Sequence, residues 1–107
     1  MGEKSYTYML RCTDGSIYTG ITKDVKRRMQ EHMEQGKECA KYTRTHTFLK
    51  LEAVFESNSW SEAARLEYAI KRLTKEKKER LIRKPELVCE MFADKLAGCD
   101  FTPVVVE

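Results

Sequence analysis

The feature that most constrains the fold is a pair of short segments, residues 5–12 and 16–22, in which polar and apolar side chains alternate. Both segments are rich in Tyr, Thr and Ile, a composition that together with the alternation predicts two β-strands. Asp14-Gly15 lies between them and is typical of the turn of a β-hairpin. The chain therefore begins with a predicted antiparallel pair of strands.

The length of the turn decides where the tyrosines of this hairpin point. If residues 14–15 form a two-residue turn, Tyr8 lies on the face of the sheet opposite Tyr18. If residues 13–15 form a three-residue loop with a left-handed glycine, Tyr8 pairs with Gly20 and shares a face with Tyr18. The local sequence is compatible with both arrangements.

The order of the predicted elements indicates the fold class. We expect helices over residues 24–36, 60–73, 74–83 and 86–98, a polar connection over 41–46 and a strand over 48–56. The order ββαβαα predicts an α+β fold, in which a central three-stranded antiparallel sheet is flanked by helices. The last stretch, DFTPVVVE, is apolar but ambiguous. Residues 1–84 are predicted to form one domain, with residues 85–107 as a helical extension packed on it.

Two of these helices have capping signals at their expected beginnings. Ser59 and Glu62 form a capping box, which opens the helix near Trp60. Thr22 or Asp24 can cap the first helix in the same way.

Composition excludes several classes of protein. The chain has 107 residues, 41% of them hydrophobic and 35% charged, which indicates about one globular domain. No apolar run approaches the ~20 residues of a membrane span, and the N-terminal MGEKSY lacks a signal-peptide core. The four cysteines include no C-x-x-C pair, which argues against a zinc site. We expect a cytoplasmic protein that does not enter a membrane.

The net charge of +3 is unevenly distributed along the chain. Residues 71–84, KRLTKEKKERLIRK, contain eight basic and two acidic side chains. Such a segment is either a solvated helix face or a surface that attracts phosphate. Residues 85–107 are acidic and carry apolar side chains, so they are a poor DNA-binding surface. This tail either closes the core or offers a surface to a protein partner.

The first predicted helix places polar residues on its apolar side. At 100° per residue, Val25, Arg28, Met29 and His32 share one face. A buried guanidinium is costly unless it meets an anion, so Arg28 should pair with an internal carboxylate or with a phosphate. His32 is either a satisfied core histidine or part of a site.

The second long helix presents a similar case. Glu67 lies between Ala63 and Ile70 on the apolar side, where a carboxylate needs a cation. That cation is either Arg28 or a divalent metal such as Mg²⁺, which keeps several waters and needs few protein ligands. Lys71, one turn further on, is a salt-bridging neighbour or a phosphate contact. A Tyr, Arg, His and Glu set suits phosphodiester hydrolysis better than acyl transfer.

At this point the residues resemble a known family. YTY at 6–8 and YTG at 18–20 are similar to the paired signature of the GIY-YIG nuclease superfamily, although the letters differ. Arg28 follows the second motif at the family's spacing, and Glu67 within EAARLEYAIKRL matches its metal-binding glutamate. The resemblance covers roughly residues 5–83. The stretches most similar to the small stand-alone bacterial branch are CTDGSIYTGITKDVKRRMQEH, AKYTR and AIKRL.

The resemblance implies a DNA endonuclease that uses one divalent cation, Mg²⁺ or Mn²⁺. It implies that Glu67 binds the metal, Arg28 steadies the scissile phosphate and Tyr18 acts as the general base or relays to it. Tyr8 would orient water or phosphate, and His32 would assist proton transfer or bind phosphate. A shared site requires both tyrosines on one face, so we predict the three-residue loop.

Further residues are expected around this site. A free tyrosine has a pKa near 10, so a tyrosine base needs a nearby cation. Some family members have a lysine directly after the second motif, whereas this chain has Ile21, and Lys23 or Lys41 could replace it. Gly20 would leave room beside Tyr8 for a phosphate or a water. The predicted substrate-binding residues are Gly20, Lys23, Lys41, Tyr42, Arg44 and Lys71.

The expected partner is DNA, bound through its phosphate backbone and selected by structure, with a role in repair or recombination. Two alternatives stay open. One is a module that keeps the fold and binds nucleic acid without cutting it. The other is a subunit that needs a protein partner, docked through residues 85–107, for targeting.

Overall fold

The structure is a computed structural model, and it describes residues 4–34, 48–93 and 101–104. Its elements lie around one antiparallel sheet of strand order β2-β1-β3-β4. The strands are β1 (Ser5–Cys12), β2 (Ile17–Thr22), β3 (Phe48–Ser57) and β4 (Phe101–Val104). The helices are α1 (Val25–Glu34), α3 (Trp60–Lys71), α4 (Lys75–Arg83), the short 3₁₀ turn η1 (Pro85–Leu87) and α5 (Val88–Met91).

The hairpin has the three-residue loop that was predicted. Gly15 has a φ of +86°, the left-handed conformation that glycine adopts without strain. The backbone N–H of Cys12 donates to the carbonyl of Ser16 at 2.9 Å. Tyr8 pairs with Gly20 across the two strands. The prediction about the turn is therefore confirmed, and Tyr8 and Tyr18 share a face of the sheet.

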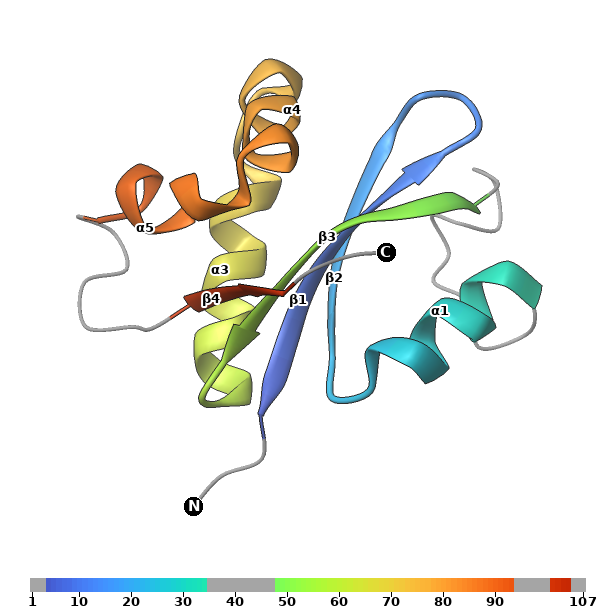
Figure 1. Cartoon of the computed structure of the whole chain (residues 1–107), viewed down its shortest axis with the longest axis horizontal. Helices are drawn as coiled ribbons and strands as arrows, with labels where there is room; N and C mark the ends of the chain where they lie inside the picture. The colour runs from blue at the N-terminus through green and yellow to red at the C-terminus, as the bar shows by residue number, and fades with distance from the viewer. Residues whose placement is uncertain (1–3, 35–47, 94–100, 105–107) are drawn as a thin grey trace.

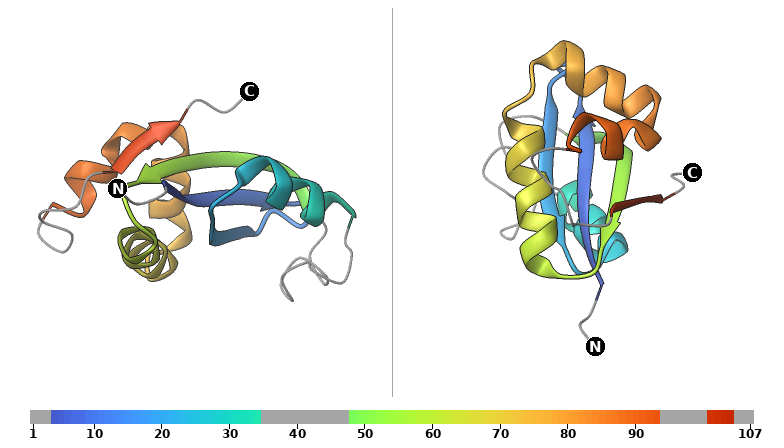
Figure 2. Two further views of the ribbon diagram at one scale, coloured as in Figure 1. Left: turned by 90° about the horizontal axis from the view of Figure 1, so that it is seen from below. Right: turned by 90° about the vertical axis from the view of Figure 1, so that its left-hand side faces the viewer.

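The two faces of the sheet are covered by different helices (Figure 1). On one side lie α3, α4 and α5, and on the other lies α1. The larger apolar cluster fills the first side, and its buried members are Met9, Ala53, Phe55, Leu66, Ile70, Leu81, Val88, Phe92 and Phe101. A smaller cluster of Tyr8, Leu10, Cys12 and Val54 lies on the side of α1. The right-hand view of Figure 2 shows α3 alongside β2, at the edge of the sheet.

Side-chain caps begin the helices at the expected places. Ser59 accepts a hydrogen bond from the backbone N–H of Glu62 at 3.1 Å, and Glu62 in turn reaches back to the N–H of Asn58 at 3.4 Å. Of the two candidates for α1, Asp24 is the cap, because its carboxylate accepts from the N–H of Arg27 at 3.1 Å.

Two expectations about the C-terminal part were wrong. The sheet has a fourth strand, β4, which pairs with β3 along the edge of the sheet, so the expected count of three strands is too low. The helix expected over 86–98 ends much earlier, because α5 stops at Met91 and Phe92 turns into the core. Residues 94–98 lie outside the described residues.

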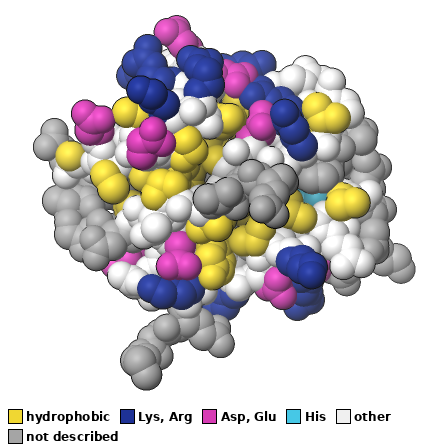
Figure 3. Space-filling model, viewed as in Figure 1, with side chains coloured by type: hydrophobic (Ala, Val, Ile, Leu, Met, Phe, Trp, Pro, Cys, Tyr) yellow, Lys and Arg dark blue, Asp and Glu magenta, His cyan; other side chains and the backbone are white. Residues whose placement is uncertain are grey.

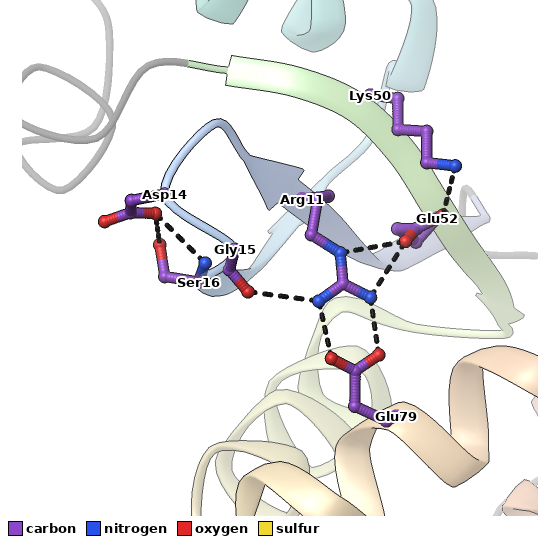
Figure 4. Close-up of polar contacts among 7 residues, drawn as sticks. All are labelled: Arg11, Asp14, Gly15, Ser16, Lys50, Glu52 and Glu79. Carbon is purple, nitrogen blue, oxygen red and sulfur yellow. Dashed lines mark hydrogen bonds and ion pairs between the residues drawn. The ribbon is translucent and has the colours of Figure 1, made fainter.

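An ion network fastens the hairpin to α4 (Figure 4). The guanidinium of Arg11 donates to both carboxylate oxygens of Glu79 at 2.5 and 2.6 Å. It also donates to Glu52 of β3 at 3.0 Å and to the carbonyl of Gly15 at 3.1 Å. One half-buried side chain thus joins β1, β3, the hairpin loop and α4, and it holds the hairpin in a fixed position relative to the helices.

Candidate active site

Tyr8 of β1 and Tyr18 of β2 lie close together beneath α1. The rings of Tyr8 and Tyr18 are 6.1 Å apart between centroids, and each ring lies 5.7 Å from the ring of His32. Tyr8 is fully buried, whereas Tyr18 is half-buried. The hairpin and one helix therefore bring three candidate residues into mutual contact.

Arg28 and His32 both approach the hydroxyl of Tyr8 from α1. The Nε–H of Arg28 donates to this hydroxyl at 3.3 Å, and Nε2 of His32 lies 3.0 Å from it. Arg28 also donates to the carboxylate of Glu31, one turn along the helix, at 2.8 Å. The anion that Arg28 was expected to meet is thus Glu31, with Tyr8 as a second acceptor.

Burial sets the protonation of this cluster. It raises the pKa of Tyr8 to about 12, although the hydrogen bond from Arg28 acts in the opposite direction. It lowers the pKa of His32 to about 4, and the positive charge of Arg28 adds to this effect. At neutral pH, Tyr8 is therefore a neutral phenol and His32 a neutral imidazole. Because the oxygen of Tyr8 already accepts from Arg28, its O–H is placed to donate to Nε2 of His32.

The residues predicted on α3 lie at the other side of Tyr18. The ammonium of Lys71 is 5.9 Å from the centroid of the Tyr18 ring and 3.5 Å from the carboxylate of Glu67. The side chain of Glu67 is 23% exposed, so it is accessible to solvent and to a ligand. Lys71 thus connects the carboxylate of α3 with the tyrosine of β2.

A groove of about 820 Å³ opens beside this cluster. Arg28 lines both the groove and the Tyr8 cluster. The groove is formed by the end of β2, the first turns of α1 and the beginning of α3, and its lining residues are Ile21, Thr22, Lys23, Asp24, Arg27, Arg28, Glu31 and Trp60.

Comparison with known proteins decides the family. The chain matches the GIY-YIG catalytic domain over residues 4–80. It belongs to the GIY-YIG family. The match covers the hairpin, α1 and α3, the elements that carry the clustered residues.

Relatives of this chain are small proteins from bacteria and archaea, which confirms the expected small stand-alone branch. A UPF0213 protein of Fusobacterium nucleatum is 51% identical over 76% of this chain and 79% of its own. One from Halobacterium salinarum is 45% identical over 71% of this chain and 96% of its own. A UPF0213 protein from Bacillus halodurans, whose solution NMR structure is known, has 42% sequence identity to this chain. The match covers 88% of this chain and 97% of that one, and the two structures superpose with a TM-score of 0.48.

The expectation that Gly20, the glycine of the second signature motif, leaves room for a ligand is wrong. A Cβ atom added to Gly20 would lie 2.6 Å from the hydroxyl oxygen of Tyr8 and 3.0 Å from a ring carbon of Tyr18. The space expected to hold a phosphate or a water is therefore filled by Tyr8 itself. Gly20 is needed because any side chain there would push the Tyr8 ring out of place.

The other predicted residues divide into three groups. The structure brings Tyr8, Tyr18, Arg28 and His32 together, with Lys71 and Glu67 beside Tyr18. Lys23 lines the groove, with its ammonium over the ring of Trp60. Lys41, Tyr42 and Arg44 lie outside the described residues. None of the helices in the described parts has the length and apolar character needed to cross a membrane.

Trp60 is the residue that sequence reasoning missed. It was treated only as the start of a helix, yet its side chain lines the groove and is 46% exposed. Its signal was a large aromatic side chain directly after a capping serine, off the predicted apolar face of the helix.

Proposed function

We propose that this GIY-YIG protein is a metal-dependent endonuclease that hydrolyses phosphodiester bonds in DNA. One observation supports the proposal above the others: Arg28, Tyr8, Tyr18 and His32 form one contiguous cluster, and Glu67 lies beside it through Lys71. A guanidinium, a phenol and a carboxylate supply a phosphate ligand, a proton acceptor and a metal ligand.

Arg28 would hold the scissile phosphate. The side chain is held in place by Tyr8 and Glu31, and it is 23% exposed, so its outer N–H groups can reach a ligand. A phosphate oxygen can take the place of the Glu31 carboxylate, because both are anionic acceptors that suit the planar guanidinium. The hydrogen bond that Arg28 donates to Tyr8 would keep the Arg28 side chain oriented during this exchange.

Tyr18 would accept the proton of the attacking water. Of the two tyrosines it has the more accessible side chain, and the Lys71 ammonium lies 5.9 Å from the centroid of its ring. Tyr8 is unsuited to this role, because burial holds its pKa near 12. We therefore propose Lys71, in place of Lys23 or Lys41, as the cation near the base.

Glu67 would hold the divalent cation. Within the described parts of the chain, no three acidic, histidine or cysteine side chains are grouped as metal ligands. A lone accessible carboxylate still fits Mg²⁺ or Mn²⁺, since such an ion keeps several waters and takes other ligands from the phosphate. When bound, the ion would neutralise charge that develops on the phosphate oxygens. Lys71 would then be released from Glu67 to contact the phosphate.

The basic segment would bind the flanking backbone. Lys and Arg side chains gather over α4 at the top of Figure 3. Lys71 lies at Tyr18, and the ammonium of Lys75 is 3.8 Å from the point where a Gly15 side chain would begin. These two cations follow the hairpin from the tyrosine to the loop. Such contacts attract DNA without reading its sequence, which agrees with selection by structure.

A cleavage assay on a panel of substrates tests the proposal. Purified protein would be incubated with nicked, branched, single-stranded and duplex DNA in Mg²⁺ or Mn²⁺, in parallel with Glu67→Ala. We expect metal-dependent cleavage of at least one substrate and loss of that cleavage in the variant. Cleavage that survives Glu67→Ala, or binding of DNA with no cleavage of any substrate, would contradict it.

A further inference from the structure

Within the described residues, Trp60 is part of neither apolar cluster. It is the single tryptophan of the chain. Its side chain is 46% exposed. A solvated polar residue would serve equally well as the first residue of α3. An exposed aromatic face beside a groove offers a contact surface to another molecule.

The surroundings of Trp60 indicate the chemistry of that molecule. The ammonium of Lys23 lies 6.0 Å from the centroid of the Trp60 ring. The side chains of Arg27 and Arg28 line the same groove. An aromatic face next to several cations matches a nucleotide, whose base stacks and whose phosphate pairs with the cations.

The acidic residues of the groove do not cancel this preference. The carboxylate of Asp24 caps α1 by accepting from the backbone N–H of Arg27 at 3.1 Å. The carboxylate of Glu31 pairs with Arg28 at 2.8 Å and with Arg27 at 3.3 Å. Both carboxylates are thus directed at groups of α1, and the groove keeps an excess of positive charge.

We propose that this groove binds an unpaired nucleotide of the substrate, with its base stacked on Trp60 and its phosphate held by Lys23 and Arg27. The base must be unpaired because the faces of bases within a duplex are covered by their neighbours. The inference rests on the proposed nuclease function, and it adds a subsite that favours substrates with a single-stranded segment.

The position of the subsite fits a strand that continues to the catalytic cluster. Arg28 lines the groove and bonds Tyr8, so the two sites share a side chain. Trp60 and Glu67 are seven residues apart on α3, which is about 10 Å at 1.5 Å per residue. At ~3.4 Å per stacked nucleotide, this separation corresponds to about three nucleotides of one strand.

Tryptophan fluorescence reports on the subsite directly, because Trp60 is the only source of the signal. The protein, kept in a metal chelator to prevent cleavage, would be titrated with a single-stranded 12-mer of thymidine and with a blunt duplex of the same length. We expect the single strand to quench Trp60 and the duplex to leave it nearly unchanged. Equal quenching by both would overturn the preference for an unpaired base.

Affinity for the single strand, measured by anisotropy of a labelled 12-mer, provides the second test. Trp60→Ala should weaken binding by roughly fivefold or more, the loss expected for one stacked base. Trp60→Phe should keep most of the affinity, since its ring can still stack. Tyr68→Ala is the matched control, because Tyr68 is 64% exposed on the same helix and contacts Arg72 rather than the groove. Equal affinities of Trp60→Ala and Tyr68→Ala, with both variants folded by circular dichroism, would overturn the proposal.

The two proposals fail in different ways. Quenching of Trp60 without cleavage of any substrate would contradict the nuclease function and leave the subsite standing. Metal-dependent cleavage without quenching would contradict the subsite alone. Quenching by an acidic peptide but not by the oligonucleotide would assign the groove to a protein partner and overturn the nucleotide proposal.

Discussion

The hydroxyl of Tyr8 lies 3.0 Å from Nε2 of His32, in a fully buried position between the hairpin and α1. Arg28, whose side chain is 23% exposed, donates to the same hydroxyl at 3.3 Å. The neutral imidazole of His32 therefore holds the Tyr8 ring in place. Tyr8 in turn orients the guanidinium of Arg28, which is proposed to bind the phosphate. Because His32 is buried, we assign it to positioning Tyr8 rather than to direct contact with the phosphate.

Removing the Tyr8 hydroxyl tests this chain of contacts. Tyr8→Phe removes one of the hydrogen-bond acceptors of Arg28, so the guanidinium should be less well oriented. Cleavage should then fall by about 10- to 100-fold. The buried partners left without a hydrogen bond should also cost about 1–3 kcal/mol of stability. Tyr6→Phe, a change on the same strand, is the control and should cleave at nearly the wild-type rate. Wild-type cleavage by Tyr8→Phe would show that Arg28 does not depend on this bond.

Burial of His32 predicts a pH dependence of stability. Its pKa is about 4 in the folded protein and about 6.5 when unfolded, so the unfolded chain binds more protons between these values. The contribution of neutral His32 to the free energy of unfolding is complete above about pH 6.5. It is lost as the pH falls toward 4, by at most about 3 kcal/mol. Urea unfolding at pH 7.5 and 5.0 measures the change. His32→Asn should show a smaller loss between the two pH values, and an identical loss would contradict the assignment.

Substitutions of the two hairpin glycines should have different effects, one on cleavage and the other on stability. A methyl group at Gly20 would lie 2.6 Å from the Tyr8 hydroxyl, so Gly20→Ala should displace Tyr8 and reduce cleavage by at least about tenfold. Gly15→Ala forces a left-handed backbone on alanine and should cost about 1–2 kcal/mol of stability, with cleavage per folded molecule unchanged. Cleavage rates and urea unfolding of both variants separate the effects. Full activity in Gly20→Ala would contradict the close packing of Tyr8.

The ion network of Arg11 should contribute to stability but not to chemistry. Glu79→Gln removes the charge of a bidentate, half-buried partner and should cost about 1–3 kcal/mol. Glu76→Gln on the same helix is the control: its side chain is 84% exposed and lies 4.0 Å from Arg80, so its cost should stay below about 0.5 kcal/mol. Urea unfolding measures both. Equal stability of the two variants would show that Arg11 does not anchor α4.

Local signals predicted much of the fold and the site. The local sequence of the hairpin left two registers open, and the family resemblance selected the three-residue loop that Gly15 forms. The beginnings of the helices depend on caps such as Ser59, so they could be inferred from neighbouring residues. Arg28 and His32 were located because helical periodicity placed polar groups on an apolar face. These inferences need only short-range geometry.

The missed features depend on contacts between distant segments. β4 forms only by pairing with β3, and Pro103 is tolerated because it lies on an edge strand, which no local pattern indicates. The approach of Lys71 to Tyr18 follows from the way α3 lies against β2, so sequence spacing alone could not predict it. The groove at Trp60 needs the ends of three elements to meet, and it was missed for the same reason.

The role of Glu67 is the central claim, and one comparison of rates tests it most directly. Single-turnover cleavage of the preferred DNA substrate in Mg²⁺ would be measured for the wild type, Glu67→Gln and Glu62→Gln. Glu62 lies on the same helix and serves its cap, a role that glutamine can also fill. We predict that Glu67→Gln is slower by at least about 100-fold, since a bound metal ion contributes several kcal/mol, whereas Glu62→Gln cleaves at the wild-type rate. Equal rates for the two variants would contradict the account.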